Sequence, residues 1–282
     1  MQSIDSVGER KKKMKRKTYD ELDFTDDYMF CRILTSNLSL TKNLLELILN
    51  VPIKKVQVAE AQKSIKESYD GKGIRLDVYV EDDNNTVYDV EMQTTKQADI
   101  PKRTRYYQGM IDMFLINKGA NYKELKKSYV IFICLDDIFD KSRCVYTFEN
   151  RCIEDTSIRL VDESTKVLIN PRGCRDGLSE DMNDFLDFLM GEEAQSEFTR
   201  EIKAEVTQAR KREDWRSDYM TLEMIRKEER EEGRTEGVIE GRLKTIIEIV
   251  LEGDYSLEKG AEKAGMTIPE LKEKAKEFGY EL

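Results

Sequence analysis

The sequence of 282 residues contains no histidine. Ser-His-Asp triads, Cys-His dyads and histidine-ligated zinc sites are therefore excluded, as is every nuclease that activates water with an imidazole. If the chain is an enzyme, its proton chemistry must come from carboxylates, lysines or a metal ion.

Cysteines and long apolar runs are also scarce. The cysteines are odd in number and none lies in a C-x-x-C pair, which argues against a disulfide framework or a zinc site. They are Cys31, Cys134, Cys144, Cys152 and Cys174. We interpret them as small, buried, reduced side chains. The longest apolar run, Tyr129–Leu135, is far shorter than the roughly 20 residues of a membrane helix. The charged N-terminus has no signal-peptide core, so we expect a cytoplasmic protein with no membrane partner.

Charged residues are abundant and unevenly distributed. Lysine and arginine number 47 against 57 for aspartate and glutamate, which gives a net charge of −10. Residues 1–20 are predicted to form a disordered basic arm, because basic side chains crowd it without apolar partners. The arm is either a solvated tail or a contact to nucleic acid. The negative total argues against tight non-specific DNA binding but is compatible with local, salt-sensitive contacts.

Residues 21–177 are predicted to form the core of the protein. Helices are expected at Phe24–Leu34, Ser39–Asn50 and Pro101–Asn117. Strands are expected where apolar residues alternate or where β-branched and aromatic residues gather. These segments are Val56–Ala61, Gly71–Glu81, Thr86–Thr94, Ser128–Leu135, Val145–Phe148, Ile158–Val161 and Lys166–Ile169. Because helices and strands interleave, the fold class is predicted to be α/β.

Residues 178–282 carry only helical patterns and are predicted to form an all-helical extension. It begins with a short helix at Asp181–Met190, continues as a long charged helix, and ends in a hairpin of Ser256–Ala264 and Ile268–Phe278. The hairpin has the outline of a helix-turn-helix, but the glutamates of its second helix favour a structural or pairing role.

Three glycines recur at a spacing of four late in the sequence, at Gly233, Gly237 and Gly241. In a helix they lie near one face. They fit either a solvated helix or a pairing surface through which a homo-oligomer assembles.

The informative segment surrounds the turn at residues 82–85. A hairpin that turns at Asn84 places Asp77 directly across from Glu91, with their Cβ atoms about 5 Å apart, and Gln93 next along that face. Two carboxylates so close repel one another unless a cation lies between them, and Mg²⁺ prefers one or two carboxylates together with water and phosphate oxygens. The alternative is that these are ordinary polar side chains on the solvent-facing side of an amphipathic hairpin.

Several motifs in order along the chain resemble one nuclease family. They are TDDYMF at 25–30, GIRLDVYV at 73–80, DVEMQ at 89–93, KRTRYYQGMI at 102–111 and the later EGRTEGVIEGR. Together they resemble the recombination-promoting nuclease and transposase family of the PD-(D/E)xK superfamily. The resemblance implies a restriction-endonuclease-like mixed sheet flanked by helices. It also implies a Mg²⁺-dependent DNA endonuclease, with Mn²⁺ as another candidate ion, that promotes recombination.

The resemblance also implies residue roles. Asp77 and Glu91 match the metal ligands, and Asp27 matches an acidic residue that contacts the metal or its water. Gln93 stands where the superfamily usually has the lysine that positions the attacking water. Cys31 replaces a lysine that follows Asp27 in the family motif.

A basic cluster follows the second strand, at the start of the next predicted helix. Such side chains near a helix N-terminus are suited to hold DNA phosphates. The residues are Lys96, Lys102, Arg103 and Arg105.

Two other functions stay open on the sequence alone. A non-catalytic protein with a nuclease fold, assembled through its C-terminal helices, would account for Gln93 and Cys31. An RNA-directed hydrolase would use the same metal chemistry, because that chemistry acts on either backbone.

Overall fold

The computed structural model describes residues 17–66 and 72–282. Most of the predicted basic arm, residues 1–16, therefore lies outside the described residues, and its last lysine, Lys17, pairs with Asp26 (Nζ–Oδ2 2.6 Å). The chain forms two compact units, of which the first ends at Glu213 and the second comprises Asp214–Leu282.

The first unit is built on a six-stranded mixed sheet with the strand order β1-β2-β3-β4-β6-β5. The first three strands pair antiparallel, β3, β4 and β6 run parallel, and β5 is antiparallel to β6. The strands are β1 (Val56–Ile65), β2 (Ile74–Asp82), β3 (Val87–Gln93), β4 (Ser128–Cys134), β5 (Val145–Phe148) and β6 (Ser164–Ile169).

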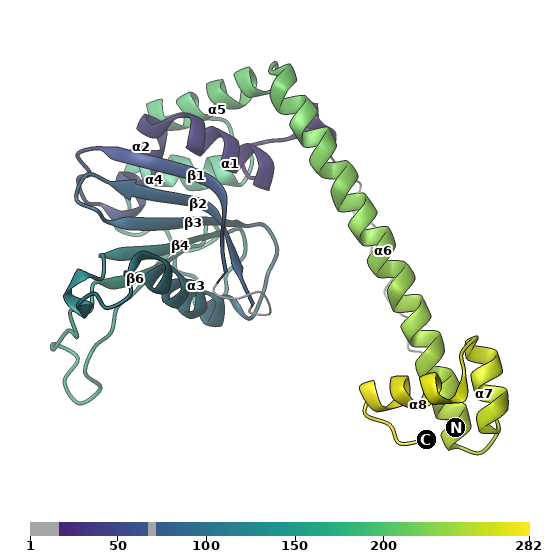
Figure 1. Cartoon of the computed structure of the whole chain (residues 1–282). Helices are drawn as coiled ribbons and strands as arrows, with labels where there is room; N and C mark the ends of the chain where they lie inside the picture. The colour runs from purple at the N-terminus through teal and green to yellow at the C-terminus, as the bar shows by residue number, and fades with distance from the viewer. Residues whose placement is uncertain (1–16, 67–71) are drawn as a thin grey trace, which may run out of the picture. The chain divides into compact units, whose positions relative to one another are not determined.

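Helices cover both faces of this sheet, with α3 on one face and α1, α2, α4 and α5 on the other (Figure 1). Their bounds are α1 (Asp27–Ser36), α2 (Leu38–Leu49), α3 (Ile100–Leu115), α4 (Glu180–Leu189) and α5 (Glu197–Ala209), with 3₁₀ turns at Tyr19–Glu21 and Tyr122–Glu124. Because both faces are covered, the central strands β3 and β4 are buried almost throughout. The predicted α/β class, a mixed sheet flanked by helices and followed by a helical region, is confirmed.

Local sequence signals explain where the elements near the site begin and end. The Asn37 side chain accepts a hydrogen bond from the Leu40 amide (3.0 Å) at the start of α2. The same helix ends at Asn50 in a left-handed conformation (φ 50°), shortly before Pro52. Pro101 lies in the first turn of α3, where a missing amide hydrogen costs nothing.

A side-chain-closed turn fixes the β2–β3 hairpin. Asp82 Oδ1 accepts hydrogen bonds from the amides of Asn84 (2.9 Å) and Thr86 (2.8 Å), and Asp82 Oδ2 accepts one from the Tyr88 hydroxyl (2.8 Å). The strands then pair Val78 with Val90, which is the register that the sequence predicted.

One predicted strand is wrong. Residues 158–161 lie in the connection between β5 and β6. In this connection Arg159 forms an isolated β-bridge with Arg151 rather than part of a strand. Ile158, Leu160 and Val161 are exposed. Their β-branched composition suggested a strand, but β5 pairs directly with β6, so this segment lies outside the sheet.

The second unit is helical, with α6 (Glu213–Leu251, its first residue in the other unit), α7 (Leu257–Ala264) and α8 (Ile268–Glu277). The predicted terminal hairpin packs on the end of α6 through Leu243, Ile247, Ala261, Leu271 and Ala275. The region expected to form one long charged helix contains two helices, α5 and α6, separated by a break at residues 210–212. In the described part of the chain no helix is long and apolar enough to cross a membrane.

The five cysteines are free, as predicted. Cys31, Cys134 and Cys144 are buried, whereas Cys152 is half-buried and Cys174 is exposed, so the predicted burial is wrong for these last two.

Replacing Asp82 with alanine should destabilise the first unit by about 2–4 kcal/mol, because a buried acceptor of three hydrogen bonds is lost. Urea unfolding followed by circular dichroism measures this change. Asn84→Ala, at an exposed position of the same turn, is the control and should change stability by less than about 0.5 kcal/mol. Equal effects of the two substitutions would contradict this account of the turn.

Candidate active site

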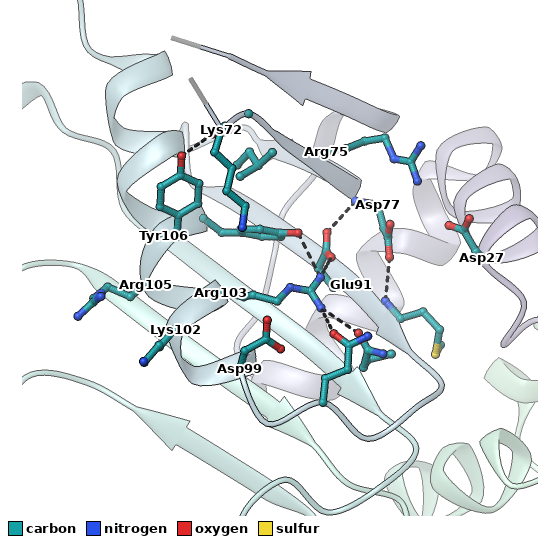
Figure 2. Close-up of a pocket in the computed structure, with 16 residues that line it drawn as sticks. Asp27, Lys72, Arg75, Asp77, Glu91, Asp99, Lys102, Arg103, Arg105 and Tyr106 are labelled. Carbon is teal, nitrogen blue, oxygen red and sulfur yellow. Dashed lines mark hydrogen bonds and ion pairs between the residues drawn. The ribbon is translucent and has the colours of Figure 1, made fainter. Parts of the chain in front are cut away.

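Most of the residues that the sequence singled out line one cavity of about 990 Å³. It is lined by residues from α1, β2, β3 and α3 (Figure 2). The predicted site residues that line it are Asp27, Asp77, Glu91, Gln93, Lys102, Arg103 and Arg105. Lys96 is not among its lining residues and instead pairs with Asp140 (Nζ–Oδ1 2.7 Å).

Asp77 and Glu91 lie side by side on neighbouring strands. The Asp77 amide donates a hydrogen bond to Glu91 Oε1 (2.8 Å), and the Met92 amide donates one to Asp77 Oδ2 (3.2 Å). Each carboxylate is thus held by a backbone N–H of the opposite strand. Glu91 is only 3% exposed, so the alternative of ordinary side chains on a solvent-facing sheet surface is wrong for this hairpin.

Burial makes this pair of carboxylates reluctant to ionise. Burial, with the charge of Asp27 adding to it, raises the pKa of Asp77 to about 6. Burial, with the charge of Asp77 adding to it, raises the pKa of Glu91 to about 8. The hydrogen bonds from the backbone and the nearby Arg103 oppose these shifts without cancelling them. An additional cation at this place would therefore be strongly favoured.

A third carboxyl group lies on the Glu91 face of β3. Asp89 is fully buried, and in the described part of the chain neither of its oxygens has a hydrogen-bond partner. Burial, followed by the charge of Glu91, raises the pKa of Asp89 well above its ordinary value. The alternation of β3 placed Asp89 on this face, but nothing in the sequence indicated how deeply it is buried.

Arg103 points into the site rather than out toward solvent (Figure 2). Its Nη1 donates to Gln93 Oε1 (3.0 Å) and Gln97 Oε1 (3.0 Å), and its Nη2 donates to the Tyr107 hydroxyl (3.1 Å). Nη2 also lies 3.4 Å from Glu91 Oε2. Arg103 is therefore part of the wall that holds Glu91 and Gln93, a position that the sequence did not predict.

The rim of the cavity is basic. Lys102 and Arg105 are exposed and point away from Glu91 in Figure 2. Lys72, just before β2, and Arg75, near its start, line the same cavity, and neither was singled out from the sequence. The Tyr106 hydroxyl donates to the Lys72 carbonyl and so links α3 to that segment.

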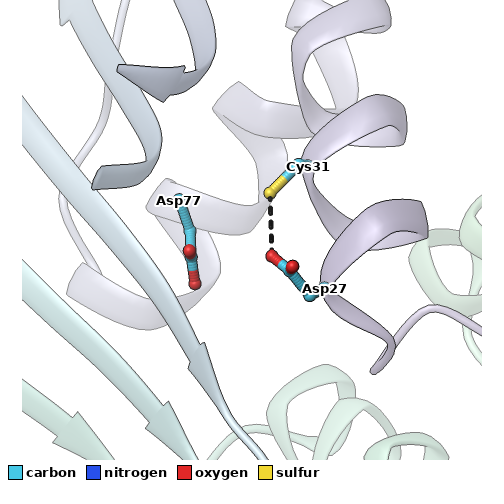
Figure 3. A group of neighbouring side chains, drawn as sticks. All are labelled: Asp27, Cys31 and Asp77. Carbon is cyan, nitrogen blue, oxygen red and sulfur yellow. Dashed lines mark hydrogen bonds between the residues drawn. The ribbon is translucent and has the colours of Figure 1, made fainter. Parts of the chain in front are cut away.

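The side of the cavity formed by α1 carries a mixed group of possible metal ligands. Asp27 and Cys31 are four residues apart on α1, and with Asp77 they place one ligand atom each within 4.8 Å of one another (Figure 3). The Cys31 sulfur donates to Asp27 Oδ1 (3.6 Å). Burial, with the charges of Asp77 and Asp27, raises the pKa of the Cys31 thiol far above its ordinary value.

These donors suit a divalent cation. Asp27, Asp77 and Glu91 supply the carboxylate oxygens that Mg²⁺ and Mn²⁺ prefer. Among the described residues Asp77 has no ion pair, although the charges of Arg75 and Arg103 lie close enough to lower its pKa.

Comparison with known proteins identifies the family to which the chain belongs. Residues 24–233 match the model of the PD-(D/E)XK nuclease family transposases. Because the match spans most of the sequence, the chain belongs to this family, as its motifs predicted. Membership implies a transposase-like nuclease that acts on phosphodiester bonds. No significant match was found among curated proteins or among solved structures.

Asp77 and Glu91 have raised pKa values in the folded state, so their ionisation destabilises the metal-free protein as pH rises. Between about pH 4 and pH 8 the folded state retains protons that the unfolded chain releases. In EDTA, Glu91→Gln should therefore unfold at a higher urea concentration than the wild type at pH 8. The gain should be on the order of 1–3 kcal/mol and should shrink toward pH 5.

Glu60→Gln, an exposed carboxylate on β1, is the control and should leave the pH dependence unchanged. A Glu91→Gln variant that is less stable than the wild type at pH 8 would contradict the charge repulsion inferred for this site.

Proposed function

We propose that the chain is a metal-dependent endonuclease that hydrolyses phosphodiester bonds of DNA and thereby promotes recombination. The observation that carries the proposal is the opposed pair Asp77 and Glu91, which lines a cavity with a basic rim. Membership of a nuclease family supports the same chemistry.

Asp77 and Glu91 would hold a Mg²⁺ or Mn²⁺ ion, with Asp27 contacting the ion or its water. When bound, the ion would lower the pKa of a coordinated water and neutralise charge on the phosphodiester. The backbone N–H groups of Asp77 and Met92 keep the two carboxylates in place, so the ligands are oriented before an ion arrives.

Gln93 and Arg103 act together in this proposal. The Gln93 side-chain amide donates to the Thr95 carbonyl (2.9 Å), and its oxygen accepts from Arg103. Gln93 would orient the attacking water but carries no charge. Arg103 would supply positive charge beside the phosphate, because its guanidinium lies against both Gln93 and Glu91.

The basic rim would hold the DNA backbone. Lys102 and Arg105 are exposed at the start of α3, Arg75 lines the cavity from β2, and Lys72 lines it from the segment just before β2. Lys96 would contribute only after leaving Asp140. Such contacts to phosphate are salt-sensitive, which is compatible with the net charge of −10.

Supercoiled plasmid incubated with the full chain tests the proposal. Nicking or linearisation is expected with Mg²⁺ or Mn²⁺ and not with EDTA. Asp77→Asn and Glu91→Gln should each reduce the rate at least 100-fold, on the order of the loss expected when metal catalysis is removed. Glu60→Gln should cleave as the wild type does.

Retained cleavage in either site variant would reject the assigned ligands. No cleavage of plasmid, single-stranded DNA or RNA by the wild type with any metal would favour the non-catalytic alternative. Cleavage of RNA alone would identify a ribonuclease.

Arg103 and Arg105 should respond differently to substitution. Arg103→Ala removes charge next to Glu91 and Gln93, so kcat should fall about 100-fold with a smaller change in KM. Arg105→Ala removes a rim charge, so KM should rise and its salt dependence should weaken, with kcat nearly unchanged. An Arg103→Ala variant with a raised KM and an unchanged kcat, like Arg105→Ala, would show that Arg103 only binds DNA.

A homo-oligomer formed through the C-terminal helices is a separate proposal. Within the described residues, a Cβ atom built at Gly233, Gly237 or Gly241 meets nothing within 4 Å, so this face of α6 has room for a neighbouring helix. Light scattering of the full chain, compared with a Gly237→Arg variant, measures whether that face is used.

A further inference from the structure

We propose that Cys31 is a metal ligand, and that Asp27, Cys31 and Asp77 together bind thiophilic divalent cations such as Zn²⁺ and Cd²⁺. Because Asp77 belongs both to this group and to the proposed catalytic pair, Zn²⁺ bound here would compete with Mg²⁺ and inhibit cleavage. The regulatory part of this inference rests on the proposed nuclease function, whereas the binding part does not.

The geometry of the group matches a small tetrahedral ion. Ligand atoms around tetrahedral Zn²⁺ lie roughly 3–4 Å apart, given metal–ligand distances of about 2.0–2.3 Å. The carboxylate oxygens and the sulfur already lie within 4.8 Å of one another, so small side-chain rotations would complete the site. Figure 3 shows the Cys31 sulfur and both carboxylates facing the same space between α1 and β2.

The surroundings of Cys31 distinguish it from an ordinary buried cysteine. Its side chain is 2% exposed, yet it contacts the carboxylate of Asp27 rather than only apolar groups. Asp77 stands on the other side and has no ion pair among the described residues. A cation placed between the three side chains would contact both carboxylates and the sulfur at once.

The mixture of one sulfur and two carboxylate ligands also determines which metal ions are preferred. Carboxylate oxygens alone favour Mg²⁺ or Mn²⁺, whereas a thiolate favours Zn²⁺ and other soft ions. Three protein ligands with one open position are an arrangement that Zn²⁺ commonly adopts. Of the two other buried cysteines, Cys134 and Cys144, neither belongs to such a group of ligands in the described part of the chain.

Cadmium titration of the full chain tests the binding directly, because a sulfur–cadmium bond gives an ultraviolet charge-transfer band independent of activity. The wild type should show a saturable band. Cys31→Ser should lose that band and bind Zn²⁺ at least tenfold more weakly, with its Mg²⁺ affinity nearly unchanged. Cys144→Ser, which removes an equally buried thiol elsewhere, is the matched control and should keep the band.

Asp27→Asn provides a second variant in case Cys31→Ser does not fold, and it should weaken the band while leaving the thiol in place. A band of equal intensity and affinity in the wild type and both variants would overturn the inference. A Cys31-dependent band in a wild type that cleaves no nucleic acid would support the metal site and reject the proposed function. If the wild type cleaves, micromolar Zn²⁺ should inhibit it, and added Mg²⁺ should relieve that inhibition in the wild type.

Discussion

The first unit is organised around the repulsion between two carboxylates on adjacent strands, the buried Glu91 and the half-buried Asp77. Asp77 and Glu91 are held together by backbone N–H groups of the opposite strand, and burial raises the pKa values of both. A fold that served stability alone would separate such groups, because unpaired buried charges are costly. Their arrangement is understandable when a divalent cation belongs between them, as expected in a PD-(D/E)XK nuclease family.

The register of the hairpin could be predicted because it depends on local signals. The turn at residues 82–85 and the alternation on either side of it together determine that residue 77 lies across from residue 91. The strand predicted at 158–161 failed for the converse reason. Its residues suit a strand, but whether a strand forms depends on a neighbour that the local sequence does not specify.

The contributions of α1 and α3 depend on tertiary packing, and so the sequence revealed less about them. Arg103 was predicted to face DNA with its basic neighbours, yet the way α3 lies on the sheet directs its guanidinium toward Glu91 and Gln93. In the sequence, Cys31 was notable only because it replaces a lysine of the family motif. Its sulfur lies near Asp77 because α1 packs close to β2, which the sequence alone does not show. Side-chain direction on a helix follows from how that helix packs, which a local pattern does not encode.

The central claim is that Asp77 and Glu91 form a divalent-cation site, and Mn²⁺ binding followed by electron paramagnetic resonance tests it most directly. Free Mn²⁺ gives a sharp signal that is lost on binding, so the measurement requires neither substrate nor activity. The account predicts saturable binding to the wild type that is abolished in the Asp77→Asn, Glu91→Gln double variant. Equal Mn²⁺ binding by the wild type and the folded double variant would contradict it.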